Sequence, residues 1–486
     1  MSRAALVVLV VLAGCRRPPD AALPVVIAPA LGEPPHETVA PAPRARGPSQ
    51  TIDIRYDRAA DAWDVTWTFA EPTLGLVFDR RKPRFRTATW TAAPGAHWAI
   101  EGDAETLRAD DETARTTFAV RFATDDASRQ RAMPLNLRWR DGGRLLFTGS
   151  LGGHALVCGP TACTRRDVGT ERIWQISAAG ELRILATTGR DTLTWHEPMG
   201  ELRGTYLYVG ARTATDVAEV TTLVDRGVPA WLAAATQRDL PPLLASYAAR
   251  TGVALPFRPL VLISRGPSTA RRRRGVRGSA LPGLVQLEAN GGGWDRDGRA
   301  ARRQWFELVA HEAFHLWNSQ LARRAEVRDE WWSEGASSYV AGRALRDAGY
   351  LDARRYQRRM LRAANACLRS LRGPLLDEAA EASYYTCGEL VHFVVDRRVS
   401  GGVWPIYAAL FAGAQVQGTY ATADFVALLG DAALVADLEQ ILGRGLGDQP
   451  ARFVQRLLAG AGLATRIDAR RHRPVRLVAA SGTVGR

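Results

Sequence analysis

Two histidines and a glutamate lie within one helical turn in the stretch FELVAHEAFHLWN, residues 306–318. On an α-helix, His311 and His315 project from the same face about 6 Å apart, so both imidazoles can reach one metal ion. Glu312 lies beside the first histidine, where it can accept a proton from water without being a ligand. This pattern predicts a zinc site, although a buried histidine pair held by hydrogen bonds would show the same letters.

A carboxylate at a suitable distance strengthens the zinc prediction. Glu334 lies in the segment DEWWSEGASSYVAGRAL, with eighteen residues between it and His315. A tetrahedral catalytic zinc needs a third protein ligand and leaves its fourth position to water. We expect Ser333 to cap a second helix and Glu334 to lie in its first turn.

Each ligand imidazole also needs a group that orients it through its other ring nitrogen. Asn318 and Asp329 are both close enough in the sequence to serve. The sequence does not choose between them.

The spacing of HExxH, eighteen residues and glutamate resembles that of the gluzincin zinc peptidases, in particular the aminopeptidase N family and the glycyl aminopeptidase family. HEAFHLWN is similar to the motif of the second family, and WWSEGASSYVA fits the W-x-x-E-G-x-x-S-Y pattern that both share. The resemblance implies a Zn²⁺ cofactor bound by His311, His315 and Glu334. It also implies Glu312 as general base and a peptide or protein substrate.

The same resemblance directs attention to a downstream tyrosine. These families place a phenol at a Y-x-x-G position, where it donates a hydrogen bond to the developing oxyanion. Tyr385 and Gly388 match this pattern in SYYTCGELVHFVVD, with Tyr384 as a less favoured substitute. The alternative for Tyr385 is a core tyrosine on an amphipathic helix.

Relatives of aminopeptidase N also carry Gly-x-Met-Glu-Asn on an edge strand, and its glutamate binds the free amine of the substrate. The stretch GLVQLEAN has Glu288 at a similar distance, 23 residues before His311, but the motif is degraded. The resemblance therefore implies Glu288 as the amine anchor, with an ordinary glutamate at a strand end as the alternative. This residue governs whether the enzyme trims N-termini or cuts internally.

The elements that must position these residues fall into two regions. Alternation in WDVTWTFA, and similar patterns in RFRTATWTA, TTFAVRFAT, RLLFTGSL and GTYLYVGA, predict an antiparallel β domain over residues 51–227. From residue 228 a helix-like stretch, the strand PLVLIS and the apolar segment GLVQLEA lead into mostly helical sequence from Arg299.

The predicted fold class is thus multi-domain α+β. The resemblance implies that residues 228–402 form a thermolysin-like catalytic domain of the α/β type. A mainly helical region over residues 403–486 follows it.

The basic charge of the chain does not predict nucleic-acid binding. The formal net charge is +14, but Lys82 is the only lysine and the arginines are scattered in pairs. Since no stretch resembles a nucleic-acid-binding module, we expect mainly solvated arginine faces. The densest run, ARRRRGVRG at residues 270–278, is predicted to be an exposed loop that can contact an acidic substrate or anionic lipid.

The N-terminus indicates export. MSRAALVVLVVLAGC, residues 1–15, resembles a bacterial lipoprotein signal, which implies lipidation at Cys15 and a location in the bacterial cell envelope, facing the periplasm or exterior. The alternative is an ordinary secretory signal or a short anchor. Residues 16–50 are rich in Pro and Ala and read as a tether. Four further cysteines favour the local pairs Cys158 with Cys163 and Cys367 with Cys387, with free thiols as the alternative.

The sequence therefore predicts a lipid-anchored zinc peptidase, most simply an aminopeptidase, with an endopeptidase or a hydrolase of a non-peptide amide as the alternative within the enzymes. A non-enzymatic lipoprotein that keeps the fold as a binding module is the alternative from another class. Side-chain preference and oligomeric state have no signal in the sequence.

Overall fold

The computed structural model describes residues 50–78, 85–102, 104–124, 135–158, 163–166, 172–197, 204–266, 273–468 and 476–479. The signal-like segment with Cys15, and the predicted tether apart from Gln50, lie outside these residues. Within the described ranges, no helix combines the length and apolar character needed to cross a membrane.

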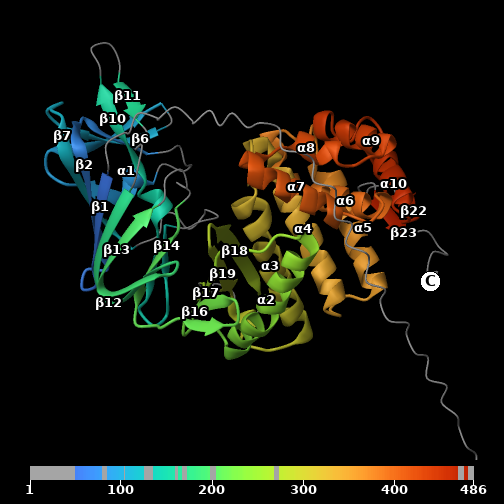
Figure 1. Ribbon diagram of the computed structural model, residues 1–486, viewed down its shortest axis with the longest axis horizontal. Coiled ribbons are helices and arrows are strands. Elements are labelled where there is room, and N and C mark those ends of the chain that lie inside the picture. The colour runs from blue at the N-terminus through green and yellow to red at the C-terminus, as the bar shows by residue number, and fades with distance from the viewer. Residues whose placement is uncertain are drawn as a thin grey trace, which may run out of the picture. The chain divides into compact units, whose positions relative to one another are not determined.

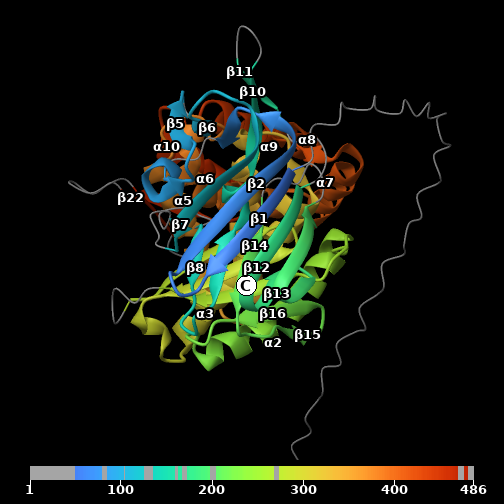
Figure 2. The same ribbon diagram turned by 90° about the vertical axis from the view of Figure 1, so that its left-hand side faces the viewer.

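Two β-sheets account for the N-terminal described residues, and Figure 2 shows several strands of the larger sheet side by side. The larger sheet has the order β4-β7-β2-β1-β12-β14-β9-β8, with β13 also paired to β12. Its strands are β1 (Gln50–Asp57), β2 (Ala62–Thr73), β4 (Trp90–Ala92), β7 (Arg115–Ala123), β8 (Asn136–Arg138), β9 (Arg144–Phe147), β12 (Arg172–Ile184), β13 (Thr187–Glu197) and β14 (Tyr206–Gly210). The smaller sheet has the order β11-β10-β3-β6-β5 and consists of β3 (Gly75–Phe78), β5 (Ala96–Glu101), β6 (Ala104–Ala109), β10 (Gly153–Cys158) and β11 (Cys163–Arg166).

The alternation in β2 predicted its buried face. Trp63, Val65 and Trp67 are fully buried, and they pack in a core cluster with residues of both sheets. The pairing is mostly antiparallel, as predicted, but β1 and β12 are parallel. The antiparallel prediction is wrong for this pair, because the alternation of side chains fixes the faces of a strand and says nothing of its direction.

One predicted strand is partly a helix. In RFRTATWTA only β4 is extended, whereas α1 (Arg86–Thr89) forms a single helical turn. Arg86 explains the difference, because its buried guanidinium donates to the Glu105 carboxylate and to the Ser150 carbonyl. A tertiary ion pair therefore overrides the local preference for a strand.

A third sheet and two helices form the α/β part that carries the HExxH motif. The sheet has the order β15-β16-β17-β19-β18, and Figure 1 shows α2 and α3 beside it. The elements are β15 (Thr215–Val217), β16 (Val220–Val224), α2 (Ala230–Thr251), β17 (Leu260–Arg265), β18 (Gly275–Leu281), β19 (Leu284–Asn290) and α3 (Arg299–His315). β15 and β16 fall within the predicted β domain of residues 51–227, but in the structure they belong to this third sheet, where β16 pairs with β17.

The predicted arginine loop is partly a strand. Residues 267–272 lie outside the described chain, but β18 begins at Gly275 and pairs antiparallel with β19 through a tight turn at Gly283. The prediction of an exposed loop is therefore wrong for Gly275 to Gly278. The short strand has no alternating apolar pattern of its own, and its pairing with β19 holds it in place.

The remaining described chain is mainly helical. Its helices are α4 (Glu330–Asp347), α5 (Ala353–Ser370), α6 (Glu381–Arg398), α7 (Trp404–Gln417), α8 (Thr422–Ala427), α9 (Ala432–Gly443) and α10 (Pro450–Gly460). Two small strand pairs complete it: β20 (Arg323–Arg324) with β21 (Thr419–Tyr420), and β22 (Thr465–Asp468) with β23 (Arg476–Ala479).

Glycines lie at two of the breaks between these helices. Gly349, Gly401 and Gly402 have positive φ, a conformation that glycine adopts without steric cost. A large apolar core joins α2, α3 and the later helices, and a smaller cluster joins residues of β8, β9 and β14 to the third sheet. The predicted α+β class, with an N-terminal β-rich part and a helical C-terminal part, is confirmed.

Candidate metal centre

The three predicted ligands come together. His311 and His315 lie on α3, and Glu334 lies in the second turn of α4, since that helix begins at Glu330. The separations are 3.1 Å between the two Nε2 atoms, 3.2 Å from His311 Nε2 to Glu334 Oε2 and 3.4 Å from His315 Nε2 to the same oxygen. Among the described residues these side chains form a three-donor cluster suited to a metal ion.

These separations fit one tetrahedral ion. Ligands at about 2.0–2.1 Å around a tetrahedral zinc are roughly 3.3–3.4 Å apart from one another. The three measured edges are close to that value. Two imidazoles with facing Nε2 atoms also cannot satisfy each other when both present lone pairs, whereas a cation between them and the carboxylate can satisfy all three. The residues therefore fit zinc.

Glu334 provides the negative charge of the centre. Burial alone would raise the pKa of its carboxyl, but His315 and His311 hold that pKa well below its ordinary value. Burial alone would lower the pKa of His315, and the Glu334 carboxylate instead raises it to about 9. Mutual attraction in a buried site accounts for both shifts.

The predicted cap at Ser333 is wrong. Asp329 occupies the N-cap position of α4, and Ser333 lies inside the helix, where its hydroxyl donates to the Glu330 carbonyl. The short helix η4 (Val327–Asp329) leads directly into α4, so the helix begins four residues earlier than a serine cap at Ser333 would require.

Asn318 orients one ligand. It lies in η3 (Leu316–Leu321), a stretch of π-helix that continues α3, and its Oδ1 lies 3.0 Å from His315 Nδ1. Its amide nitrogen donates to the Ser333 carbonyl and to Ser337 Oγ, which fixes Oδ1 as the acceptor. Nδ1 of His315 is therefore the donor to this oxygen, and Nε2 is the nitrogen that can bind a metal once it has lost its proton.

Asp329, the other candidate, does not reach a ligand histidine. Its Oδ1 accepts hydrogen bonds from the backbone and hydroxyl of Thr422, and its Oδ2 accepts one from the Glu326 amide. Its place is in the support of α4, where it ties the start of the helix to the chain after β21.

Other supporting residues escaped the sequence analysis. The Tyr420 hydroxyl donates to the Asn318 carbonyl at 2.7 Å, and the Ser338 hydroxyl lies 3.5 Å from His311 Nδ1. Ser338 follows Glu334 by four residues on the same helical face, which was a usable signal. Nothing in the sequence predicts Tyr420, because it lies more than a hundred residues from Asn318.

Glu312 faces the edge of the third sheet. It is 7% exposed, and burial raises the pKa of its carboxyl above the ordinary value, although His311 and His315 oppose the shift. A Cβ atom on Gly278 of β18 would lie 2.5 Å from the Glu312 side chain. Only glycine therefore lets the edge strand approach the carboxylate this closely. An isolated glycine within a strand is a known sign of such an approach, which the sequence analysis did not use.

Tyr385 lies beside the candidate ligands. Its ring centroid is 6.0 Å from that of His311, with the planes 22° apart, and the residue is 47% exposed. Partial burial, with the Glu334 and Glu312 carboxylates, raises the pKa of the phenol above its ordinary value. The phenol keeps its proton at neutral pH and can donate it in a hydrogen bond. Tyr384 is buried, and its hydroxyl donates to the Asp377 carbonyl.

A disulfide holds the helix that carries Tyr385. Cys367 of α5 and Cys387 of α6 are bonded, which confirms the second predicted pair. The side chains of Cys158 and Cys163 lie outside the described residues. The bridge joins α6 to α5 two residues after Tyr385.

Glu288 does not join the site. The edge strand of the third sheet is β18, and β19, which carries Glu288, lies between β17 and β18. Glu288 pairs with Arg277, whereas the next residue, Gly278, is the one that faces Glu312. Since alternate residues of a strand point to opposite faces, Glu288 projects from the face opposite α3. The prediction that it anchors the amine fails on this geometry.

Comparisons with known proteins give fold likeness alone. No sequence model of a protein family matches the chain, and no curated protein sequence is similar to it. The structure of native yeast LTA4 hydrolase superposes with a TM-score of 0.51 at 11% identity, over 81% of this chain and 67% of that one. An M1 zinc metallopeptidase from Deinococcus radiodurans gives a TM-score of 0.47 at 16% identity, over 82% of this chain and 95% of that one. The chain therefore shares the fold of the yeast hydrolase over most of its length.

Proposed function

We propose that this protein is a zinc-dependent peptidase. The observation that carries the proposal is the triangle of His311 Nε2, His315 Nε2 and Glu334 Oε2, with edges of 3.1–3.4 Å, beside a buried glutamate and an exposed tyrosine. A bound zinc would polarise both a water molecule and the scissile carbonyl group. Without the Glu312 carboxylate or the Tyr385 phenol beside it, the same triangle of ligands would suit a structural metal equally well.

The chain's own residues have separate parts in this chemistry. Glu312 takes a proton from the attacking water and later delivers it to the leaving amine, and its raised pKa suits it to both transfers. Tyr385 donates a hydrogen bond to the oxygen of the carbonyl as it becomes negatively charged. Asn318 holds the His315 ring in the orientation that presents Nε2.

The experiment that tests the proposal compares the wild type with Glu312→Gln. The variant keeps all three ligands, so zinc content by elemental analysis is expected to stay at one ion per chain. Hydrolysis of a mixed peptide library should fall by about 10²–10⁴-fold, the usual contribution of a general base. Full activity in the variant, or a wild type that binds zinc and hydrolyses no peptide, would contradict the proposal. The second result would favour a non-enzymatic binding module.

The edge strand favours an endopeptidase over an aminopeptidase. β18 has the sequence GVRGSAL and carries no carboxylate that could bind a free amine. An extended substrate can still add to its open edge through backbone hydrogen bonds. We therefore propose that cleavage does not depend on a free N-terminus.

One peptide in free and N-acetylated form decides this point. Both forms are expected to be cleaved with kcat/KM values within a few-fold of each other. A preference of a hundredfold or more for the free amine, about 2.7 kcal/mol, would instead indicate an aminopeptidase. The residue that binds the free amine would then lie outside β18.

We also propose attachment to a bacterial envelope membrane through a lipid on Cys15. The support is the signal-like sequence of residues 1–15 and the Pro- and Ala-rich stretch after it. Metabolic labelling with a fatty acid should mark the wild type and not Cys15→Ala. A protein that stays soluble and unlabelled would contradict the attachment.

A further inference from the structure

A cavity of about 570 Å³ lies away from the metal centre, among α4, α5, α6 and the start of α7. Tyr339 and Arg343 of α4 line it, and they lie on a different helical face from Glu334 and Ser338, which face the histidines. On α6 it begins at Phe393, eight residues beyond Tyr385, which corresponds to about 12 Å along a helix. The proposed function does not use this cavity.

The charge around the cavity is positive. Arg343, Arg346 and Arg397 line it, against one carboxylate, Asp396. Asp396 accepts hydrogen bonds from Arg343 and from the Val403 amide, so that single negative charge is already engaged. α7 also begins here, at Trp404, and the N-terminal end of a helix carries partial positive charge.

The wall of the cavity holds buried donors without acceptors. The Nε of Arg343 and the Nε1 of Trp404 are buried, and neither has a hydrogen-bond partner among the described residues. The hydroxyl of Tyr356 is also buried, beside Tyr339. Tyr356 is only 5% exposed. Buried polar groups are normally paired, so two unpaired donors around one cavity indicate an acceptor that the described residues do not provide.

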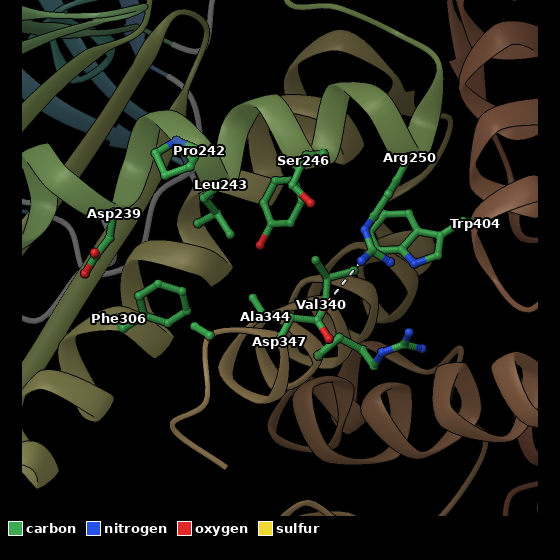
Figure 3. Close-up of a pocket in the computed structure, with 13 residues that line it drawn as sticks. Asp239, Pro242, Leu243, Ser246, Arg250, Phe306, Val340, Ala344, Asp347 and Trp404 are labelled. Carbon is green, nitrogen blue, oxygen red and sulfur yellow. Dashed lines mark hydrogen bonds and ion pairs between the residues drawn. The ribbon is translucent and has the colours of Figure 1, made fainter. Parts of the chain in front are cut away.

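A neighbouring cavity supplies the contrast (Figure 3). It has a volume of about 340 Å³ and shares Arg343 and Trp404 in its lining. Its charges balance, because Asp239 and Asp347 accompany Arg250 and Arg343, and Arg250 pairs with Asp347 at 3.1 Å. The remaining lining is largely apolar. An excess of positive charge therefore belongs to the larger cavity and not to this whole region.

We propose that the larger cavity binds a small oxyanion, a carboxylate or phosphate carried by a small molecule. Two arginine side chains with a helix N-terminus supply the attraction, and the donors of Tyr356 and Trp404 supply direction. The aromatic rings of Tyr339 and Phe393 offer an apolar surface to the group that carries the anion.

Calorimetric titration of the zinc-loaded protein tests this site with inorganic phosphate, benzoate and the neutral analogue benzamide. Benzoate or phosphate should bind saturably, and benzamide at least about tenfold more weakly, because hydrogen bonds to a charged group exceed those to a neutral one. Equal binding of benzamide and benzoate, or no saturable binding of either anion, would overturn the proposal.

Variants locate the binding. The double variant Arg346→Gln with Arg397→Gln should lower the affinity for the anion by about tenfold or more. Tyr356→Phe should lower that affinity several-fold. Both changes remove charge-assisted contacts. The matched control is Arg354→Gln with Arg358→Gln, which removes two exposed arginines of α5 that do not line the cavity. It should bind as the wild type does.

A metal-site variant separates the cavity from the zinc, which also attracts anions. His315→Ala should lose zinc and keep anion affinity. Loss of affinity in His315→Ala but not in the cavity variants would place the anion at the metal and overturn the proposal, as would an equal loss in the α5 control. Circular dichroism of each variant confirms that it is folded, and Tyr356→Phe keeps the test decisive should the double variant unfold.

Discussion

The chemistry of the candidate centre depends on a few side chains whose neighbours set their protonation. Glu312 is buried and its pKa is raised, whereas Glu334 is partly buried beside two imidazoles and its pKa is lowered. Two carboxyl groups therefore have different affinities for a proton in one site. Such a difference separates a proton carrier from a ligand.

Tyr385 provides a prediction at this scale. Tyr385→Phe should lower kcat by about 10²–10³-fold, as loss of an oxyanion donor usually does, while KM changes little and zinc content is unchanged. Steady-state kinetics with one peptide measures both constants. The neighbouring change Tyr384→Phe is the control, since its hydroxyl bonds the Asp377 carbonyl and should leave kcat within a few-fold. A similar loss of kcat in both variants would contradict the role of Tyr385 as the donor to the oxyanion.

Asn318 provides a second residue-scale prediction. Asn318→Ala should weaken zinc binding by about 10–100-fold, because the His315 ring loses the acceptor that orients it. Competition with a zinc chelator measures the affinity. Asp329→Asn, the other candidate from the sequence, should keep the affinity within a few-fold because it contacts Thr422 and no ligand. The reverse order of effects would show that the wrong residue has been assigned.

At the scale of elements, the site depends on how closely β18 approaches α3. The strand is short and lies at the edge of its sheet, and Gly278 is the point of contact with Glu312. The strand can serve both as a wall behind the general base and as an open edge for an extended peptide. The distance between strand and helix thus sets the position of the base relative to the substrate.

Gly278→Ala tests this contact. The added Cβ would lie 2.5 Å from the Glu312 side chain, which must move, because the backbone of the strand is held by β19. Displacement of a catalytic group by about 1 Å can cost about 10²-fold in kcat/KM, so we expect a loss of that order with zinc retained. Gly275→Ala on the same strand would meet only Asn290, at 3.3 Å, and should retain activity. Unchanged kinetics in Gly278→Ala would disprove the proposed close approach.

At the scale of the whole molecule, the C-terminal helices support the candidate centre. Tyr420 bonds the turn that carries Asn318, and Thr422 bonds the start of the helix that carries Glu334. His392 of α6 links that helix, α4, to α7, since its Nε2 lies 3.3 Å from the Trp332 carbonyl and its Nδ1 lies 2.9 Å from the Tyr407 hydroxyl. The region after residue 403, for which the sequence offered no role, thus holds the ligand-bearing segments in place.

His392 makes stability depend on pH. Burial lowers the pKa of its imidazole to about 3 in the folded protein, against about 6.5 in an unfolded chain. Above pH 6.5 the ring is neutral in both states and the full stability is present. Below pH 6.5 the unfolded state binds the proton and the folded state does not, so stability falls until the pH reaches about 3, by up to about 1.4 kcal/mol per pH unit.

Chemical denaturation of the zinc-saturated protein from pH 7.5 to 5.5 measures this effect. The non-titrating variant His392→Gln should be less stable at pH 7.5 but should lose less free energy of unfolding on acidification. Other groups contribute equally to both proteins, so the difference between the slopes isolates His392. Equal slopes of the free energy of unfolding against pH in the two proteins would show that the His392 ring does not cause the loss of stability.

The sequence alone was sufficient for features that are local or periodic. His311 and His315 share a face because four residues span a helical turn, and the buried strand β2 follows from alternation. Cys367 and Cys387 were paired because they are near in sequence. Glu334 was found from its fixed spacing after the histidines, together with a family resemblance.

Tertiary structure decided what depends on the relation between distant segments. It selected Asn318 over Asp329 as the residue that orients His315. It placed Glu288 on an inner strand of the sheet, on the face opposite α3. It also brought Tyr420 to the backbone of Asn318, beside the metal centre. It also turned part of the arginine-rich segment into the edge strand beside Glu312. Spacing along the chain gives the face on which a side chain lies, but strand order and helix packing determine what that face meets. That is why the ligands could be predicted and their supporting residues could not.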